Sequence, residues 1–370
     1  MKLQTVGLLG FGLFTASCGV PDDGSQVDPG GATESVGSEL KTNQSIRITQ
    51  VNLVSDRPGA ATQDPNLVNP WGVAYNPAGP VWVSNNHSAT STVYDGTGAL
   101  KLTVTFPQGA GEEPASPTGQ VFSGVAADFS GDKFIFNSEG GKFYGWQPGA
   151  GVQLRANFSD LAHNYKGLAI GTMANGQTRL FGTEFKNAGV TVLNSKYEVV
   201  PLPAGAFYDP NIPAGYAPFN AQTLEGKLFV TYAKQDAEGH DDDHGVGRGY
   251  VDQYDFNGKL ERRLISRGAL NSPWGLAIAP PTFGPLAGKL LVGNFGDGRI
   301  NAYDIHAKDA SGAEKVVSLG ALADASGKAL QIDGLWAIAL SPDKSFYFTA
   351  ATLSEEHGLY GRLDSTTTGY

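Results

Sequence analysis

Short apolar runs closed by turn residues recur along most of the chain. Three of them are nearly the same, each beginning with Trp and ending with Pro: residues 71–77 (WGVAYNP), 274–280 (WGLAIAP) and 336–342 (WAIALSP). Weaker copies begin at residues 123, 166 and 220. Apolar runs of this length, bounded by Gly, Pro, Asn or Asp, are typical of buried β-strands. The pattern therefore predicts an all-β protein made of six repeated units.

Each unit contains further apolar segments in the same order. A second strand follows the turn, as in VWVSN (81–85), and a polar loop comes next. The third and fourth strands follow, as in STVYDGTG (91–98) and LKLTVTF (100–106). Four antiparallel strands in a repeat of roughly 50 residues make up one blade of a β-propeller. We therefore expect residues 46–370 to form a six-bladed β-propeller of four-stranded antiparallel blades.

The last unit has too few residues for four strands. Three strands can be placed after Trp336, whereas the β-rich run from Ile46 to Val54 (IRITQVNLV) precedes the first unit and belongs to none. We expect this N-terminal strand to complete the last blade. Pairing the two ends of the chain would close the ring and remove the exposed edges of an open sheet.

The N-terminus has the features of an export signal. Residues 1–17 contain a basic start, an apolar core from Val6 to Phe14 and small residues directly before Cys18. These features are typical of a secretory signal peptide. Cys18 also resembles the acceptor of a bacterial lipobox, in which the Cys is acylated, although Thr15 stands where that motif usually has Leu. If Cys18 is acylated, Gly19 after it favours the outer membrane as the destination. The alternative is an ordinary signal peptide.

The composition and net charge of the chain exclude some kinds of binding partner and site. Residues 18–45 are polar and acidic without a hydrophobic period, which predicts a disordered tether behind the lipid anchor. The net charge of -10 repels phosphate backbones, so we expect no nucleic-acid partner. A single cysteine excludes intrachain disulfides and cysteine-based zinc sites. We expect a monomer in the cell envelope, held at the membrane by its lipid.

Several longer runs resemble a known family. They are residues 53–77 (LVSDRPGAATQDPNLVNPWGVAYNP), residues 81–98 (VWVSNNHSATSTVYDGTG) and residues 232–255 (YAKQDAEGHDDDHGVGRGYVDQYD), together with SPWGLAIAP and VGNFGDGRINAYD. On these runs the chain resembles a bacterial family of secreted proteins of unknown function that is akin to NHL-type propellers. The resemblance implies the propeller but no activity.

Polar side chains gather where a propeller brings its loops together. The start of the first strand and the end of the second strand of a blade lie at the same face of the ring. Candidate ligand-binding residues at these positions are Asn69, Trp71, Asn85, His87, Asn137, Glu184, Lys234, Asn271, Asn294, Asp297 and Asp333. Convergent polar groups in a concave setting are typical of ligand sites. The alternative is that turns favour Asn, Asp and Gly for their backbone conformations.

Two groups of residues have the chemistry of metal ligands. Carboxylate and amide oxygens at the mouth of the channel suit Ca²⁺, with Glu184, Asn137, Asn294 and Asp333 as candidates. The run His240-Asp241-Asp242-Asp243-His244 combines imidazoles and carboxylates that could bind another divalent cation. The alternative for this run is a solvated acidic surface.

The sequence supports two functions. No Gly-x-Ser-x-Gly motif marks a nucleophilic serine, so we expect a binding module for a small molecule, a glycan or an envelope protein. The alternative is a metal-dependent hydrolase similar to gluconolactonase-like propellers, which would act on a lactone or ester at the channel mouth.

Overall fold

The computed structural model describes residues 32–34, 42–43, 45–340 and 344–367. The predicted signal peptide and Cys18 lie outside these residues. In the described part of the chain, no helix has both the length and the hydropathy that crossing a membrane requires.

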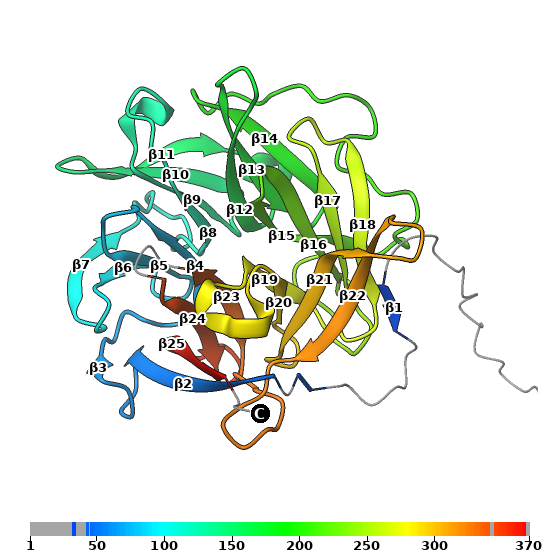
Figure 1. The fold of residues 1–370 in the computed structure, drawn as a ribbon. Coiled ribbons are helices and arrows are strands. Elements are labelled where there is room, and N and C mark those ends of the chain that lie inside the picture. The colour runs from blue at the N-terminus through cyan, green and yellow to red at the C-terminus, as the bar shows by residue number, and fades with distance from the viewer. Residues whose placement is uncertain (1–31, 35–41, 44, 341–343, 368–370) are drawn as a thin grey trace, which may run out of the picture.

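Six sheets form a ring around a central channel, with the first strand of each sheet innermost (Figure 1). Blade 1 contains β4 (Pro70–Tyr75), β5 (Val81–Asn85), β6 (Thr90–Tyr94) and β7 (Leu100–Thr105). Blade 2 contains β8 (Pro117–Phe122), β9 (Phe134–Ser138), β10 (Lys142–Gln147) and β11 (Gly151–Asn157). Blade 3 contains β12 (Tyr165–Thr172), β13 (Thr178–Glu184) and β14 (Gly189–Asn194).

The other three blades complete the ring. Blade 4 contains β15 (Tyr216–Leu224), β16 (Lys227–Lys234), β17 (Tyr250–Tyr254) and β18 (Leu260–Arg267). Blade 5 contains β19 (Pro273–Ile278), β20 (Leu290–Asn294), β21 (Ile300–Lys308) and β22 (Glu314–Ala321). Blade 6 contains β23 (Leu335–Leu340), β24 (Phe346–Thr352), β25 (His357–Thr367) and β2 (Ile46–Ser55). Short 3₁₀ helices lie at η1 (Phe129–Gly131), η2 (Ser159–Leu161) and η3 (Pro281–Leu286). The predicted six-bladed propeller is confirmed.

The N-terminal strand closes the ring as predicted. Strand β2 pairs antiparallel with β25 from Ile46 opposite Thr367 to Ser55 opposite Leu359. The short strand β3 (Thr62–Gln63) then pairs in parallel with the end of β2. The outermost position of blade 6 therefore comes from the beginning of the chain, so that unfolding either end opens the ring.

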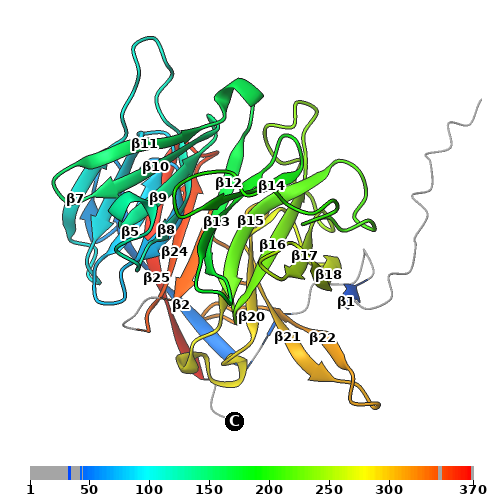
Figure 2. The same cartoon turned by 90° about the horizontal axis from the view of Figure 1, so that it is seen from above.

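Two outer edges differ in detail from the repeat. In blade 3 the fourth segment is reduced to a bridge between Leu193 and Val199, because Pro201 and Pro203 interrupt the hydrogen-bonding pattern beyond it. In blade 4 the strand β1 (Ala32–Glu34) pairs in parallel with β18 as a fifth strand, and both views place it at the rim of the ring (Figures 1 and 2). These three residues lie within the segment for which the sequence predicts a tether.

Glycines allow the inner strands to approach one another. A Cβ atom on Gly72 would lie 2.6 Å from the carbonyl oxygen of Thr118, and one on Gly119 would lie 2.3 Å from the backbone nitrogen of Leu168. Gly275 faces the carbonyl oxygen of Trp336 in the same way, at 2.8 Å. Gly72 and Gly275, which follow Trp71 and Trp274 in the repeat, therefore lie at close backbone contacts between neighbouring blades.

Candidate functional site

The loops at one face of the ring converge as expected. The start of each inner strand lies opposite the end of the second strand, as in Pro70 opposite Asn85 and Pro273 opposite Asn294. The same register brings Tyr165 opposite Glu184 in blade 3. Side chains from these positions and from the loops between second and third strands therefore share the entrance to the channel.

An aromatic cluster fills the channel at this face. The rings of Trp71 and Trp336 stack with centroids 3.6 Å apart, and Phe295 stacks on the opposite side of Trp336 at 4.1 Å. Trp274 meets Trp71 edge-on at 6.3 Å, and Phe219 packs against Trp336. These five rings come from blades 1, 4, 5 and 6, and they form an apolar floor beneath the converging loops.

A buried lysine lies on this floor. The side chain of Lys166 is only 1% exposed, and its Nζ lies 2.5 Å from Oε1 of Glu139 and 2.9 Å from Oδ1 of Asp241. The same atom lies 5.2 Å from the centroid of the Trp71 ring. Burial opposes the charge, but the two carboxylates outweigh it and hold the pKa of Lys166 above its ordinary value. The side chain of Lys166 is therefore a charged ammonium group, and both carboxylates are needed to offset the cost of burying that charge.

His240 extends this group toward solvent. Its Nδ1 lies 3.1 Å from Oδ2 of Asp241, and this hydrogen bond raises the pKa of His240 and lowers the pKa of Asp241. One potential metal-ligating atom from each of Glu139, His240 and Asp241 lies within 4.8 Å of the others. We call Glu139, Lys166, His240 and Asp241 the Lys166 cluster.

A second polar group adjoins the first. Asn69 is buried, and its Oδ1 accepts a hydrogen bond of 2.7 Å from Nε1 of Trp71. Its Nδ2 donates to Oε2 of Glu355 at 2.8 Å and lies 3.1 Å from Nε2 of His87. Burial, with repulsion from Glu139 and Asp241, raises the pKa of Glu355 to about 7. Glu355 is therefore poised to change its protonation state near neutral pH.

The loop that carries Glu355 has an unusual backbone. Leu353, Ser354 and Glu355 follow one another with φ values of 55°, 56° and 67°. Left-handed conformations are unfavourable for side chains other than Gly, Asn and Asp, so three in succession need support from their surroundings. Asp333 supplies part of it, because its Oδ2 accepts a hydrogen bond of 2.8 Å from the backbone nitrogen of Leu353.

Five blades contribute to this face of the channel. Asn69 precedes β4 of blade 1, Glu139 follows β9 of blade 2, and Lys166 lies on β12 of blade 3. Asp241 lies between β16 and β17 of blade 4, and Glu355 lies between β24 and β25 of blade 6. Asn86 of blade 1 joins the blades further, since its Nδ2 donates to Oε2 of Glu139 at 2.9 Å.

Three of the predicted ligand-binding residues form hydrogen bonds within their own blade or to a neighbouring blade. Asn85 donates to the hydroxyls of Thr90 and Thr92 within blade 1, and both bonds are 3.0 Å long. Asn137 of blade 2 donates to the carbonyl oxygen of Gly167 in blade 3 at 2.7 Å. The carboxylate of Glu184 accepts hydrogen bonds from backbone nitrogens that include those of residues 164 and 187. Their hydrogen bonds stabilise turns and blade contacts.

Two of the predicted residues, Asn271 and Lys234, secure the long loop of blade 4. Oδ1 of Asn271 accepts a hydrogen bond of 2.6 Å from the backbone nitrogen of Gly245. Asn294 donates to Oδ1 of Asp297 at 3.1 Å, and burial raises the pKa of Asp297. Lys234 forms an ion pair of 2.8 Å with Asp243. The contacts of Asn271 and Lys234 fix the loop that presents Asp241, whereas the bond between Asn294 and Asp297 lies within blade 5.

The acidic run of this loop does not converge on one centre. Asp241 points to Lys166 and His240, whereas Asp243 pairs with Lys234 and with Arg248. Asp242 has a buried side chain whose pKa is raised by burial, and its Oδ2 lies 3.9 Å from Nδ1 of His244. Of the five candidate metal ligands, the structure brings only His240 and Asp241 together with Glu139.

Comparison with known proteins identifies relatives. Uncharacterized protein R648 of Acanthamoeba polyphaga mimivirus is 31% identical over 330 residues, which cover 84% of this chain and 78% of the relative. Uncharacterized protein L690 of the same virus is 30% identical over 326 residues, covering 82% of each chain. The chain belongs to the family of these two proteins. No family model matches it, so the resemblance to the secreted bacterial family stays a prediction.

Solved structures of other proteins have the same fold. A streptogramin B lyase matches with a TM-score of 0.50 and 13% identity over 88% of this chain and 100% of the lyase. Virginiamycin B lyase from Staphylococcus aureus matches with a TM-score of 0.51 and 11% identity over 86% and 99% of the two chains. A protein of unknown function from Bacteroides thetaiotaomicron matches with a TM-score of 0.52 and 10% identity over 86% and 76%. At these identities the likeness concerns the fold alone.

Two residues at the centre of the site, Lys166 and Glu355, were not predicted from the sequence. Lys166 begins the segment KGLA, which corresponds to WGVA at residue 71 and WGLA at residue 274. The lysine stands where two other copies of the repeat have a buried tryptophan, and this difference could have identified Lys166 as a site residue. Glu355 had no such signal, because only the folded loop brings it to Asn69.

Proposed function

We propose that this protein is a binding propeller that holds a small polar ligand on the Lys166 cluster. The observation that carries the proposal is the convergence of polar side chains from five blades at one entrance, where two of these blades supply carboxylates to an ammonium group that is almost inaccessible to water. A buried ion pair contributes little net stability compared with apolar packing, so a buried lysine paired with carboxylates from two other blades favours a functional role.

Unsatisfied hydrogen-bonding groups next to the cluster support the same site. Asn164 lies two residues before Lys166 and is buried. Both Nδ2 and Oδ1 of its amide lack a partner among the described residues. Buried polar groups are normally hydrogen-bonded, to protein or to bound molecules. A ligand at the channel entrance would supply such partners.

The charges indicate which ligand fits. Glu139, Asp241 and Glu355 outnumber the single buried cation, Lys166, on the described part of this face. Carboxylates accept strong hydrogen bonds from ammonium groups and from hydroxyls. A small ligand that carries amino or hydroxyl groups therefore complements the site better than an anion.

A thermal-shift screen tests this proposal. Amines, amino acids, sugars and polyols are added to the folded protein, and ligands that raise the melting temperature are measured by calorimetry. Asp241→Asn should weaken binding at least about tenfold, because it removes a charged acceptor. The exposed Asp160 provides the matched control, Asp160→Asn. Equal affinities of both variants for every ligand would contradict the proposal.

A metal-dependent hydrolase of the lactonase or esterase kind is the second candidate. One imidazole and two carboxylates within 4.8 Å form a donor set that fits a divalent cation such as Ca²⁺ or Mn²⁺. When bound, such a cation would polarise a carbonyl group. Glu355, with its pKa near 7, would accept a proton beside it.

Metal titration separates the two candidates. Calorimetry with Ca²⁺ and Mn²⁺ should show binding that His240→Gln weakens and Glu356→Gln leaves unchanged. Hydrolysis of a chromogenic ester and of a γ-lactone should then depend on the added metal and on Glu355. If neither cation binds, the hydrolase is excluded while the binding propeller stands.

We also propose that the propeller is attached to an envelope membrane through Cys18. The support is the sequence of residues 1–18 alone, with its apolar core and small residues before the cysteine. Mass spectrometry of the protein expressed in a Gram-negative bacterium should find a lipid-modified Cys18 at the N-terminus. The Cys18→Ser variant should lose the modification, and an unmodified native chain would contradict the anchor.

A further inference from the structure

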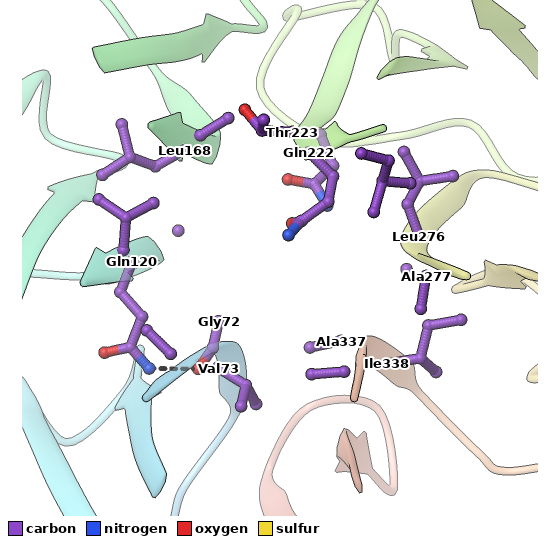
Figure 3. Close-up of a pocket in the computed structure, with 18 of the residues that line it drawn as sticks. Gly72, Val73, Gln120, Leu168, Gln222, Thr223, Leu276, Ala277, Ala337 and Ile338 are labelled. Atoms are coloured by element: carbon purple, nitrogen blue, oxygen red, sulfur yellow. Dashed lines mark hydrogen bonds between the residues drawn. The ribbon is translucent and has the colours of Figure 1, made fainter. Parts of the chain in front are cut away.

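A cavity of about 480 Å³ occupies the central channel. Its walls are the inner strands β4, β8, β12, β15, β19 and β23, and Figure 3 shows lining side chains arranged around an open centre. It extends from Trp274 of the aromatic cluster to Tyr75, Ile278 and Leu340 at the far ends of the inner strands. The aromatic cluster therefore separates it from the Lys166 cluster, and its volume is that of a small-molecule site.

The walls of this cavity are mostly apolar. Val73, Leu168, Leu276 and Ile338 come from four different blades, and none of the described residues that line the cavity is charged. Apart from Tyr75 and Trp274 at its ends, the polar side chains on the walls are Gln120, Asn220, Gln222 and Thr223. An ion would lose its hydration here without gaining a partner of opposite charge.

Three of the four polar side chains already use their donors. The amides of Gln120 and Asn220 and the hydroxyl of Thr223 donate to main-chain carbonyl oxygens at 2.6 or 2.7 Å. Figure 3 draws the bond from Gln120 to Gly72. These bonds tie neighbouring inner strands together, so these three side chains are part of the wall.

Gln222 differs from them. Its side chain is exposed although it lies in the channel, and Figure 3 shows it directed into the open centre. Its amide makes no hydrogen bond to the other described residues. The cavity therefore holds one amide that can both donate and accept a hydrogen bond.

We infer that the channel is a second binding site, for an uncharged and mostly apolar small molecule that hydrogen-bonds to Gln222. Contact with the aliphatic walls would contribute most of the binding free energy, in proportion to the apolar surface buried. The amide would orient the alcohol, amide or ester group of the ligand. This site is independent of the proposed function of the Lys166 cluster.

Fluorescence titration with N-phenyl-1-naphthylamine, a neutral probe, tests the inference. Gln222→Trp should fill the channel and weaken probe binding at least tenfold, whereas Gln331→Trp, at an exposed position outside the cavity, should leave it unchanged. Gln222→Leu should weaken the displacement of the probe by 1-decanol about fivefold, through loss of one hydrogen bond. Absent probe binding, or equal binding by Gln222→Trp, would overturn the inference.

A crystallographic measurement does not depend on any variant folding. Crystals of the native protein soaked with 10-bromo-1-decanol should show anomalous bromine signal inside the channel, with the hydroxyl near the amide of Gln222. Bromine signal confined to the outer surface, or none, would overturn the inference.

Discussion

Lys166 carries a positive charge at a place that water hardly reaches. Such a charge is tolerated only where its partners are close and correctly oriented, and here Glu139 and Asp241 meet this need from two neighbouring blades. Removing a carboxylate should therefore cost more than the ion pair itself contributes, because the charge of Lys166 stays buried without full compensation.

Replacing this lysine should be destabilising. We expect Lys166→Met to lower the free energy of unfolding by about 1–3 kcal/mol, since it leaves the largely buried carboxylate of Glu139 without its cation, whereas Asp241 is exposed to water. Lys227→Met removes a more exposed lysine paired with Glu261 and should cost less than about 1 kcal/mol. Urea denaturation measures both. A Lys166 variant as stable as the Lys227 variant would contradict the account.

Glu355 should make stability depend on pH. Its folded pKa of about 7 lies above its ordinary value of 4.5, so the folded state binds more protons between these pH values. The free energy of unfolding contributed by this group is therefore highest below about pH 4.5 and falls, by roughly 2–3 kcal/mol, as pH rises through 7.

Comparison of two adjacent residues measures this contribution. Between pH 5 and 8, Glu355→Gln should lose much less stability than the native protein, as judged by urea denaturation at each pH. Glu356→Gln, at the exposed neighbouring position, should follow the native curve. Parallel curves for all three proteins would show that Glu355 does not titrate in this range.

At the level of single residues, sequence predicted positions better than roles. Asn69 and Trp71 were expected at the channel entrance and lie there, hydrogen-bonded to each other. Asn137 was expected on a ligand-binding face, but its amide donates a hydrogen bond to the carbonyl oxygen of Gly167. The sequence pattern identifies which loop a residue occupies, whereas its role depends on side-chain direction and on partners from other blades.

The inner strands show how a short motif determines an element. Their glycines lie where a neighbouring backbone leaves no space for a Cβ atom, as at Gly119 against Leu168. The strands, the turns between them and the closing strand β2 could all be predicted because each repeats a pattern of apolar runs and turn residues. The weak fourth segment of blade 3 departs from the pattern where Pro201 and Pro203 follow Val199.

A matched pair of glycines tests the close approach. Gly119→Ala should lower the free energy of unfolding by about 2–3 kcal/mol, because its Cβ would press on the backbone of β12. Gly189→Ala meets nothing within 4 Å and should change stability by less than about 0.5 kcal/mol. Thermal and urea unfolding measure both, and equal effects would contradict this explanation of the repeat.

Removal of the closing strand should open the ring. A chain that begins at residue 57 lacks β2 and leaves the edge of β25 unpaired, so we expect it to unfold at lower temperature and to associate through that edge. A chain that begins at residue 42 keeps β2 and serves as the control. Light scattering and calorimetry compare them, and a monomeric truncated chain with an unchanged melting temperature would contradict closure by β2.

On the scale of the whole molecule, six similar sheets form the ring, but the loops that they carry differ and together form one asymmetric site. The fold was predictable because the same strands recur along the chain. The site at the channel entrance was not, because the Lys166 cluster and the adjoining pair of Asn69 and Glu355 come from distant residues and depend on loops that no repeat contains. The acidic run at 240–244 was visible in the sequence, yet only His240 and Asp241 reach the cluster.

The central claim is that ligands bind where the five blades converge. Crystals of the native protein soaked singly with small amines, polyols, and Ca²⁺ or Mn²⁺ salts, and examined for bound density, test it most directly. We predict that bound molecules or ions contact Glu139, Lys166 or Asp241 above the aromatic cluster. Density only at other places on the protein, with none at these residues, would contradict the account.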